Sequence, residues 1–325
     1  MVRLLAILFG LTIATAAGAQ VAQRIVTQVD PLTMGTDDFI RLADPALWDG
    51  LIVTRIEFRD DRAFWRLYKI DNARKPVGPL WFVPHDNENA AFQAAVYAVR
   101  AYGGQVIAIE EARSLTGPDS RMNGDVAYGR PIDPNRNFRD DTPDYARTIL
   151  AGLRQTSGLI VALHTNEPGY DASESTCGPP PQGYTGKGEI SVLLCNDLYT
   201  PRRSASGRWP FDDTDSVAIV SYPATGVPAD GFCARPLVDA DMNIMFERVA
   251  TSDGSLSNFA LFRGLSYVNL ETQDRGVTPD GLSDARGRLL AMIGTVMDRC
   301  APIEGLGLRP PPPEPLRPGK RKKRR

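Results

Sequence analysis

Two histidines and one nearby glutamate are the residues of this 325-residue chain whose types and spacing point most clearly to chemistry. His85 and His164 are its only histidines, and Glu88 follows His85 by three residues. Two imidazoles and one carboxylate make a three-ligand zinc shell, whose fourth position stays open for water as catalytic zinc requires. Either histidine alone would more often be a hydrogen-bonded surface residue, and a His-x-x-Glu pair is common by chance. Together, the three residues predict one metal centre.

The elements around these residues should bring them together. His85 directly follows an expected strand over 80–84, and His164 directly follows an expected strand over 159–163. In an open α/β sheet, the loops at the carboxyl ends of the strands converge on the ligand crevice, so both histidines should lie at one edge of the sheet. Glu88 stands where an expected helix over 89–102 begins, and a turn there lets both side chains point to one place.

Two further motifs complete a known pattern. The segment Asp133-Pro134-Asn135-Arg136-Asn137-Phe138 lies between the histidines, and Glu271 follows an apolar strand expected over 266–270. The ordered set His85-x-x-Glu88, Asp133-x-Asn135-Arg136-x-Phe138, His164 and Glu271 resembles the zinc carboxypeptidase superfamily, which includes the succinylglutamate desuccinylases and aspartoacylases. The resemblance spans about residues 80–300, and four motifs in the right order make a fairly specific signal.

This resemblance implies a role for each matching residue. His85, Glu88 and His164 would bind one zinc ion per chain, and Glu271 would act as the general base on the attacking water. Arg136, with Asn135 beside it, would hold a free carboxylate of the substrate, because its planar guanidinium offers two parallel hydrogen bonds. The alternatives are a structural ion pair of Arg136 with Asp133 or Asp140, and a solvated carboxylate at Glu271.

Some family features have no clear counterpart here. The spacing from Glu88 to His164 is shorter than in the large digestive-type carboxypeptidases, so some surface loops should be missing. A second arginine that polarises the scissile carbonyl has Arg113, Arg121 and Arg130 as candidates. For the tyrosine of a mobile lid, Tyr222 is the best candidate, although an edge aromatic is the more common explanation of such a residue.

Strand and helix patterns alternate along most of the chain. They predict an α/β protein, a three-layer αβα domain around a central mixed, mostly parallel sheet, and the resemblance implies a zinc carboxypeptidase-like fold. The lead-in over 21–50 should be irregular apart from a short helix near 37–42, and 59–62 should form a turn. The expected strands are 52–58, 63–70, 80–84, 105–110, 159–163, 217–221 and 266–270, and the expected helices 89–102, 143–155, 239–251 and 283–299. The Gly- and Pro-rich stretch 166–215 should be a long loop.

The two ends differ from the body of the chain. Residues 1–19 read as a signal peptide, with Arg3, an apolar run and small residues before Gln20; the alternative is an uncleaved anchor. Residues 20–302 should form the hydrolase domain. Residues 303–325 should be a disordered, Pro-rich basic tail, either solvated or in contact with an anionic surface or polymer. Since residues 21–302 hold 28 basic and 37 acidic residues, a specific nucleic-acid partner is not expected.

The expected export bears on the four cysteines and on the substrate. An even number of cysteines in an oxidising compartment favours disulfides, and a Cys177–Cys195 bridge would close the loop between them; buried free thiols are the alternative. The sequence thus predicts a secreted or periplasmic metallopeptidase acting on a peptide with a free carboxylate, with cell-wall peptides as one candidate. A deacylase of N-acyl amino acids and a non-catalytic binding protein with a relict site remain alternatives. A serine hydrolase is disfavoured because the chain lacks a Gly-x-Ser-x-Gly motif.

Overall fold

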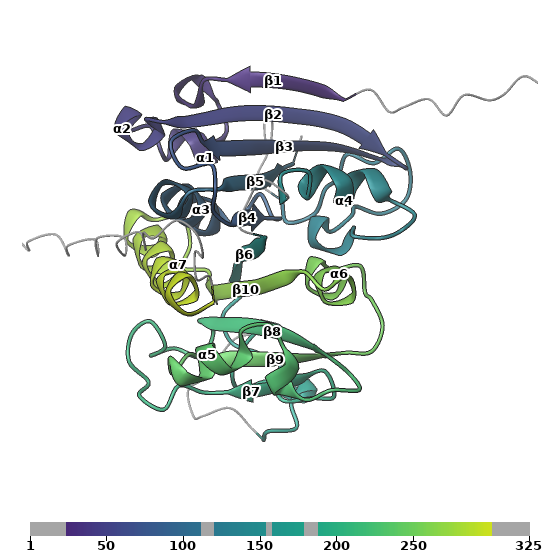
Figure 1. Cartoon of the computed structure of the whole chain (residues 1–325), viewed down its shortest axis with the longest axis vertical. Helices are drawn as coiled ribbons and strands as arrows, with labels where there is room; N and C mark the ends of the chain where they lie inside the picture. The colour runs from purple at the N-terminus through teal and green to yellow at the C-terminus, as the bar shows by residue number, and fades with distance from the viewer. Residues whose placement is uncertain (1–23, 112–119, 154–157, 179–187, 301–325) are drawn as a thin grey trace, which may run out of the picture.

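The computed structural model describes residues 24–111, 120–153, 158–178 and 188–300. Its central feature is one ten-stranded sheet in the order β1-β2-β3-β5-β4-β6-β10-β8-β9-β7, which runs the length of the molecule (Figure 1). The strands are β1 (Ile25–Val29), β2 (Leu51–Asp60), β3 (Ala63–Asn72), β4 (Leu80–Val83), β5 (Gln105–Glu110), β6 (Leu159–Asn166), β7 (Tyr199–Arg202), β8 (Val217–Pro223), β9 (Ile244–Val249) and β10 (Ser266–Gln273).

The helices lie on both faces of this sheet, as Figure 1 shows for α3 and α7 on one side and α4 and α6 on the other. They are α1 (Asp37–Ile40), α2 (Pro45–Trp48), α3 (Asn89–Tyr102), α4 (Pro143–Ile149), α5 (Ala234–Asp239), α6 (Leu256–Arg263) and α7 (Pro279–Arg299), with 3-10 turns η1 (Pro31–Thr33), η3 (Pro134–Arg136), η5 (Ala172–Glu174) and η6 (Pro228–Asp230). Most of the apolar side chains that alternate along the strands belong to two large clusters, one packed on α3 and α7 and one on α4 and α6. This alternation decides which strand residues can reach the site.

The sheet is mixed, as expected, but it is parallel only in part. The inner strands β5, β4, β6 and β10 run parallel to one another, and so do β8 and β9. The pairs β1–β2, β2–β3, β3–β5, β10–β8 and β7–β9 are antiparallel. The prediction of a mostly parallel sheet is therefore right for the inner strands and wrong for the flanks, because β2 and β3 form a hairpin and β8 returns against β10.

Several element boundaries differ from those predicted. The expected turn 59–62 is shorter, since β2 continues to Asp60 and the turn residue Asp61 takes a left-handed conformation with φ 49°. The expected helix over 143–155 is described as helical only to Ile149. The lead-in contains strand β1, and the expected long loop contains strand β7. A short edge strand gives little periodic signal, which is why the sequence did not reveal these two.

One predicted helix is wrong. The segment 239–251 holds strand β9, and the helix of that region is α5, which ends at Asp239. The run Ile244-Met245-Phe246 is buried on both faces of the sheet, between β8 and β7. A short apolar run of this kind carries no period of its own and suits a buried strand as well as a buried helix.

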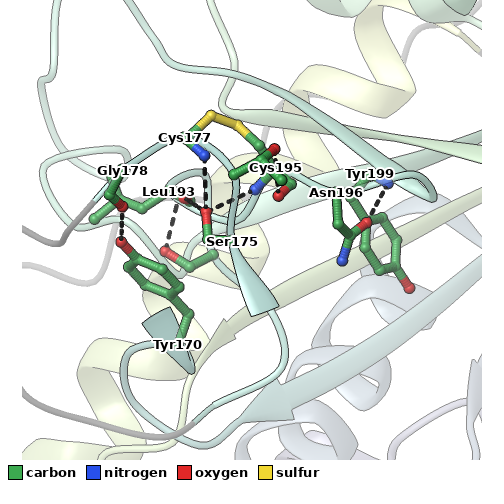
Figure 2. Close-up of a disulfide and its surroundings, with 10 residues drawn as sticks. Tyr170, Ser175, Cys177, Gly178, Leu193, Cys195, Asn196 and Tyr199 are labelled. Atoms are coloured by element: carbon green, nitrogen blue, oxygen red, sulfur yellow. Dashed lines mark hydrogen bonds between the residues drawn. A yellow bond between two sulfur atoms is a disulfide. The ribbon is translucent and has the colours of Figure 1, made fainter. Parts of the chain in front are cut away.

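Two disulfides connect the cysteines within the described residues. Cys177 pairs with Cys195, as predicted, and Cys233 pairs with Cys300. Ser175 supports the first bridge, because its Oγ accepts hydrogen bonds from the backbone N–H groups of Cys177 and Cys195 (Figure 2). The predicted signal peptide and basic tail lie outside the described residues. No described helix is both long enough and apolar enough to cross a membrane.

Candidate metal centre

The first half of the site is a single turn between a strand and a helix. The buried strand β4 ends at Val83, and His85 follows two residues later. Glu88 occupies the position just before helix α3, and its backbone N–H donates to the carbonyl of His85 over 3.2 Å. This tight turn places both side chains in the same buried space, as the His-x-x-Glu spacing predicts.

The second half comes from the neighbouring strand β6. His164 was expected just after this strand, but β6 continues to Asn166 and holds the residue within its regular backbone. The extension has a physical cause: the eight residues of β6 are all buried, and they pair along their length with β10. The position of His164 is thus set by the hydrogen bonds of the sheet, not by a loop.

The three predicted ligands converge at one point. Nδ1 of His85 lies 2.6 Å from Oε1 of Glu88 and 3.3 Å from Nδ1 of His164. Nδ1 of His164 lies 3.3 Å from Oε2 of Glu88. All three side chains are at most 2% exposed. Two ring nitrogens and a carboxylate that meet without solvent form the group within the described residues that could hold a metal ion.

The donor set and its spacing fit zinc. Ligand atoms at about 2.0–2.2 Å around a tetrahedral zinc ion lie about 3.3–3.5 Å from one another. The two 3.3 Å separations match this value, and the 2.6 Å contact between His85 and Glu88 is that of a hydrogen bond. Imidazole nitrogen and carboxylate oxygen are also ordinary zinc ligands. The residues present therefore fit the ion that the resemblance implies.

Asp133 lies behind the first histidine. Its Oδ1 is 3.0 Å from Nε2 of His85, the ring nitrogen that faces away from Glu88 and His164. Because an ionised carboxylate only accepts hydrogen bonds, Nε2 carries the proton in this contact. In the neutral ring, Nδ1 then carries the free electron pair. Asp133 therefore selects the tautomer that a metal ligand needs.

The charges of this group shift the pKa of each member. Burial alone would lower the pKa of His85, but the negative charge of Glu88 and the hydrogen bonds that the ring donates to Asp133 and Glu88 raise it. Burial alone would raise the pKa of Glu88, yet the two histidines hold it well below its usual range. For Asp133, burial likewise acts upward, and the hydrogen bond and charge of His85 lower the pKa below the ordinary value. The carboxylates are thus kept ionised beside the imidazoles.

Glu88 has two further partners. The backbone N–H of Thr165 donates to its Oε2 over 3.1 Å, and Nη1 of Arg121 donates to its Oε1 over 2.9 Å. Of the two candidates for a second arginine that the structure describes, Arg121 is therefore the one whose side chain contacts the centre. Arg113 lies outside the described residues, and the backbone carbonyl of Arg130 accepts a hydrogen bond from Arg62.

Glu271 stands beside His164 on the adjacent strand. The parallel pairing of β10 with β6 sets Glu271 opposite His164, so both side chains project from the same face. Glu271 was expected just after its strand, but β10 continues to Gln273 and fixes it. Nδ2 of Asn269 donates to Oε1 of Glu271 over 3.0 Å, and Glu271 is only 6% exposed. This carboxylate is therefore buried and held in one orientation.

Arg136 forms a different ion pair from the two considered in the sequence. Its Nη1 pairs with Oδ2 of Asp253, whereas Asp133 is engaged with His85 and Asp140 with Arg263. The Arg136 side chain remains 43% exposed, so it can still be reached from solution. It follows Asn135 in the 3-10 turn η3, which begins after Asp133. A pocket of about 290 Å³ borders Asp133 and Arg136.

Tyr222 does not reach the site. It is 5% exposed and packs in the cluster on the α3 and α7 side of the sheet, opposite to the face that carries His164 and Glu271. Tyr222 is therefore not placed as a lid residue, a role that the sequence offered only as the less common explanation. Strand alternation is the reason, because Ser221, one residue earlier, projects from the other face.

The sequence missed other residues near Arg136. Tyr199, Glu247 and Asp253 all act electrostatically on Arg136, and none was singled out. Treating Ile244–Val249 as a strand would have assigned Glu247 to the same face as Met245, which is the only signal that the sequence offers. Asp253 and Tyr199 belong to turns and an edge strand without a recognisable pattern.

Comparisons with known proteins give distant similarities. No protein-family model and no curated protein sequence matches the chain. A protein provisionally named a metallopeptidase from Shewanella amazonensis SB2B is 14% identical, with a TM-score of 0.42, over 82% of this chain and 92% of its own. A protein with the same provisional name from Shewanella denitrificans OS217 is also 14% identical, with a TM-score of 0.40, over 86% and 97%.

A third solved structure is the mDAP-bound form of Csd4 from Helicobacter pylori, a D,L-carboxypeptidase. It is 13% identical, with a TM-score of 0.36, over 69% of this chain and 51% of its own. All three similarities are weak, and the chemistry proposed for this chain rests on its own side chains.

Proposed function

We propose that this protein is a zinc-dependent hydrolase that cleaves an amide bond next to a free carboxylate, in the manner of a metallocarboxypeptidase. The observation that carries this proposal is the buried meeting of His85, Glu88 and His164, with their ligand atoms at separations suited to one zinc ion. A zinc ion bound there would polarise the scissile carbonyl and make water more acidic.

The remaining chemistry belongs to the residues of the chain. Glu271 takes a proton from the attacking water and delivers it to the leaving amine, a role worth typically about 10²–10⁴ in rate. Asn269 keeps the Glu271 carboxylate in one orientation through its hydrogen bond. Arg121, already in contact with Glu88, is the residue proposed to stabilise negative charge that develops on the carbonyl oxygen.

Arg136 and Asn135 would bind the free carboxylate of the substrate. Among the described residues, the Arg136 side chain makes a hydrogen bond only to Asp253 and only through Nη1. The remaining N–H groups of its guanidinium can therefore donate to a second carboxylate. Asn135 would donate to that carboxylate through its Nδ2, because its Oδ1, which is buried and has no hydrogen-bond partner within the described part of the chain, can only accept hydrogen bonds. Binding at these two residues would place the neighbouring amide bond at the centre.

The cellular setting belongs to the same proposal. Cleavage of residues 1–19 would deliver the domain 20–302, with its two disulfides, to the periplasm or the exterior. Peptides of the cell wall are the substrate class that this compartment favours, and the basic tail would bind an anionic surface or polymer. A substrate panel of peptides, D-amino-acid peptides and N-acyl amino acids would separate a peptidase from a deacylase.

Metal analysis combined with one substitution tests the proposal. Purified protein should hold about one zinc ion per chain, and Glu271→Gln should retain that zinc while its hydrolysis falls at least about 100-fold, because the general base is lost. Glu174→Gln, on the exposed turn η5, is the matched control and should keep both the zinc ion and the hydrolytic activity. A metal-free protein that is fully folded and active would refute the zinc mechanism, and loss of zinc in Glu271→Gln would refute the role of Glu271.

The carboxylate clamp has its own test. Arg136→Ala should raise KM for substrates with a free terminal carboxylate and leave KM for their amidated counterparts almost unchanged. Arg263→Ala removes a surface arginine of similar exposure and serves as the control. Equal activity of the unaltered enzyme on the free and amidated substrates would argue against the clamp.

A further inference from the structure

The turn η3, which carries the proposed carboxylate clamp of Asn135 and Arg136, is too short to fix its own position. It comprises three residues, and its internal hydrogen bonds all lead back to Asp133. The backbone carbonyl of Asp133 accepts from the N–H of Arg136 over 2.9 Å, and its Oδ1 accepts from the N–H of Asn135 over 2.8 Å. These bonds shape the turn, but its place in the molecule depends on contacts with other elements.

The start of helix α4 provides two such contacts. Oη of Tyr145 donates to the backbone carbonyl of Pro134 over 2.7 Å. Oγ1 of Thr142 donates to the backbone carbonyl of Asn137 over 3.0 Å. The two residues of the clamp lie between these carbonyls in the sequence, so one helix holds the clamp at both ends.

Tyr145 is itself firmly held. Its side chain is completely buried, and its ring packs against those of Trp65 and Phe138, with centroids 4.4 Å and 5.2 Å away. Its backbone N–H donates to Oδ2 of Asp60 over 2.7 Å, which connects the start of α4 to the end of β2. Burial raises the pKa of Tyr145 well above its ordinary value, so the hydroxyl keeps its proton and remains a donor. The ring therefore connects the sheet rigidly to the turn.

The turn has a close neighbour on one side and a cavity on another. The backbone of Gly254 approaches so closely that a Cβ there would lie 2.5 Å from the carbonyl oxygen of Arg136. The cavity of about 290 Å³ is lined by Asp133, Arg136 and Asn137, with Thr142 also in its wall. A gap supplies no packing atoms, so packing does not restrain the turn on that side. The two hydroxyl bonds are thus a large part of what fixes the clamp.

The geometry of the hydroxyls separates this role from stabilisation of α4 alone. Thr142 is the N-cap residue of α4, a position where threonine ordinarily accepts a hydrogen bond from the helix backbone. Within the described residues it makes no such capping bond, and its hydroxyl donates to Asn137 instead. The hydroxyl of Tyr145 likewise reaches out of its helix to Pro134. Both groups act between elements and serve the turn.

We propose that Tyr145 and Thr142 are positioning residues for the carboxylate clamp. By holding the backbone on either side of Arg136, they keep its guanidinium where the carboxylate of the substrate binds. Both residues act through the turn. This inference rests on the proposed function for the role of Arg136.

Steady-state kinetics of the zinc-loaded full-length protein tests the inference. The probes are the member of the substrate panel that is hydrolysed fastest and its counterpart with an amidated carboxylate. Tyr145→Phe and Thr142→Val each remove one hydroxyl with little change of shape. Each should raise KM for the free carboxylate about three- to tenfold, as expected for one net hydrogen bond, and leave kcat and the KM of the amide almost unchanged.

Two comparisons show whether the hydroxyls act through Arg136. Tyr102→Phe removes a buried tyrosine hydroxyl at the far end of α3, in the cluster on the other face of the sheet, and should change neither KM nor kcat. In an Arg136→Ala background, Tyr145→Phe should cause no further rise in KM, because contributions that depend on one group are not additive. Additive losses, or an equal loss of activity on the free and amidated substrates, would overturn the positioning role.

The outcomes also separate this inference from the proposed function. A raised KM in Arg136→Ala beside an unchanged KM in Tyr145→Phe and Thr142→Val would overturn the positioning role and leave the clamp in place. An unchanged KM in Arg136→Ala, or no hydrolysis of any member of the panel, would refute the proposed function and the positioning role with it. If Tyr145→Phe fails to fold, Thr142→Val decides alone and in the Arg136→Ala background.

Discussion

Asp133 shows how one residue outside the ligand set can determine the affinity of a metal centre. Its carboxylate contacts Nε2 of His85, so it fixes the ring orientation and leaves Nδ1 free for the metal. Substitution of a residue that hydrogen-bonds a metal ligand typically lowers metal affinity or activity by roughly 10- to 100-fold. The affinity of the proposed centre would therefore be set in part by a residue outside the ligand set.

Asp133→Ala should weaken zinc binding by about 10- to 100-fold, because the His85 ring loses its orientation and its preferred tautomer. Competition with a chromogenic chelator measures this affinity. Asp144→Ala, which removes an exposed carboxylate paired with Arg147, is the control and should leave zinc binding unchanged. An affinity in Asp133→Ala equal to that of the unaltered protein would mean that the contact with His85 has no such role.

The same residues make zinc binding depend on pH. Burial acts against protonation of His85, but Glu88 and Asp133 raise its pKa, so the metal-free protein holds a proton where the ion must bind. His85 stabilises the metal-free fold below the unfolded pKa of about 6.5, and this contribution is lost as the pH rises through the folded pKa.

The increase in Tm on adding zinc should consequently grow from about pH 6 to about pH 8, because fewer protons compete with the ion. Calorimetry of the metal-free and zinc-loaded protein across this range would measure it. A stabilisation by zinc that is constant or decreases with rising pH would contradict the assignment of His85 as a ligand.

At the scale of elements, the turn between α3 and β5 has a strict backbone requirement. Gly103 ends α3 with φ 83° and ψ −164°, a region that essentially only glycine occupies. A Cβ at this position would lie 2.5 Å from the backbone carbonyl oxygen of Lys75. The helix that begins at the metal centre is therefore ended by a close backbone contact.

Gly103→Ala should lower the free energy of unfolding by about 3 kcal/mol, since backbone strain and a clash with a carbonyl add together. Gly264→Ala is the matched control: Gly264 is also left-handed, with φ 63°, but a Cβ there meets nothing within 4 Å. Its loss should be about 1 kcal/mol. Denaturant unfolding measures both, and equal losses would show that the contact with Lys75 is unimportant.

How far the sequence predicts these elements depends on how regular their pattern is. Helix 89–102 and strand 105–110 match the structure at both ends, because Ala-rich spacing and Gly103 define the first and a continuous apolar run defines the second. The apolar run in 244–249 was assigned to a helix because buried strands and buried helices look alike without a period.

The candidate site, too, could be predicted from the sequence only in part. The meeting of His85, Glu88 and His164 could be foreseen from residue types and from the rule for strand ends. The contact of Asp133 with His85 and the pairing of Arg136 with Asp253 could not, because they depend on loops folded across more than 45 and 115 residues, respectively. Only the three-dimensional packing supplies such long-range contacts.

At the scale of the whole molecule, the two disulfides should differ in their contribution to stability. Cys233–Cys300 spans 67 residues and ties the end of α7 to the start of α5, whereas Cys177–Cys195 spans 18 residues within one loop. The entropy of closing these loops in the unfolded chain amounts to about 4 kcal/mol for the longer and about 3 kcal/mol for the shorter.

The double substitution Cys233→Ala/Cys300→Ala should therefore lower Tm more than Cys177→Ala/Cys195→Ala does. Thermal unfolding of both double variants beside the unaltered protein would measure the order. A larger loss from the short bridge would show that local packing around Ser175, and not the length of the closed loop, controls this part of the stability (Figure 2).

The placement of His164 and Glu271 on paired inner strands has a consequence for how such a protein can change over generations. Their spacing is fixed by the backbone ladder of β6 and β10, whereas Glu247 and Tyr199 come from β9 and β7 near the far edge of the sheet (Figure 1). Mutations at that margin can therefore change the outer strands without altering the spacing of His164 and Glu271. A lineage with this architecture can diversify its sheet edge while the pairing of the two inner strands is inherited intact.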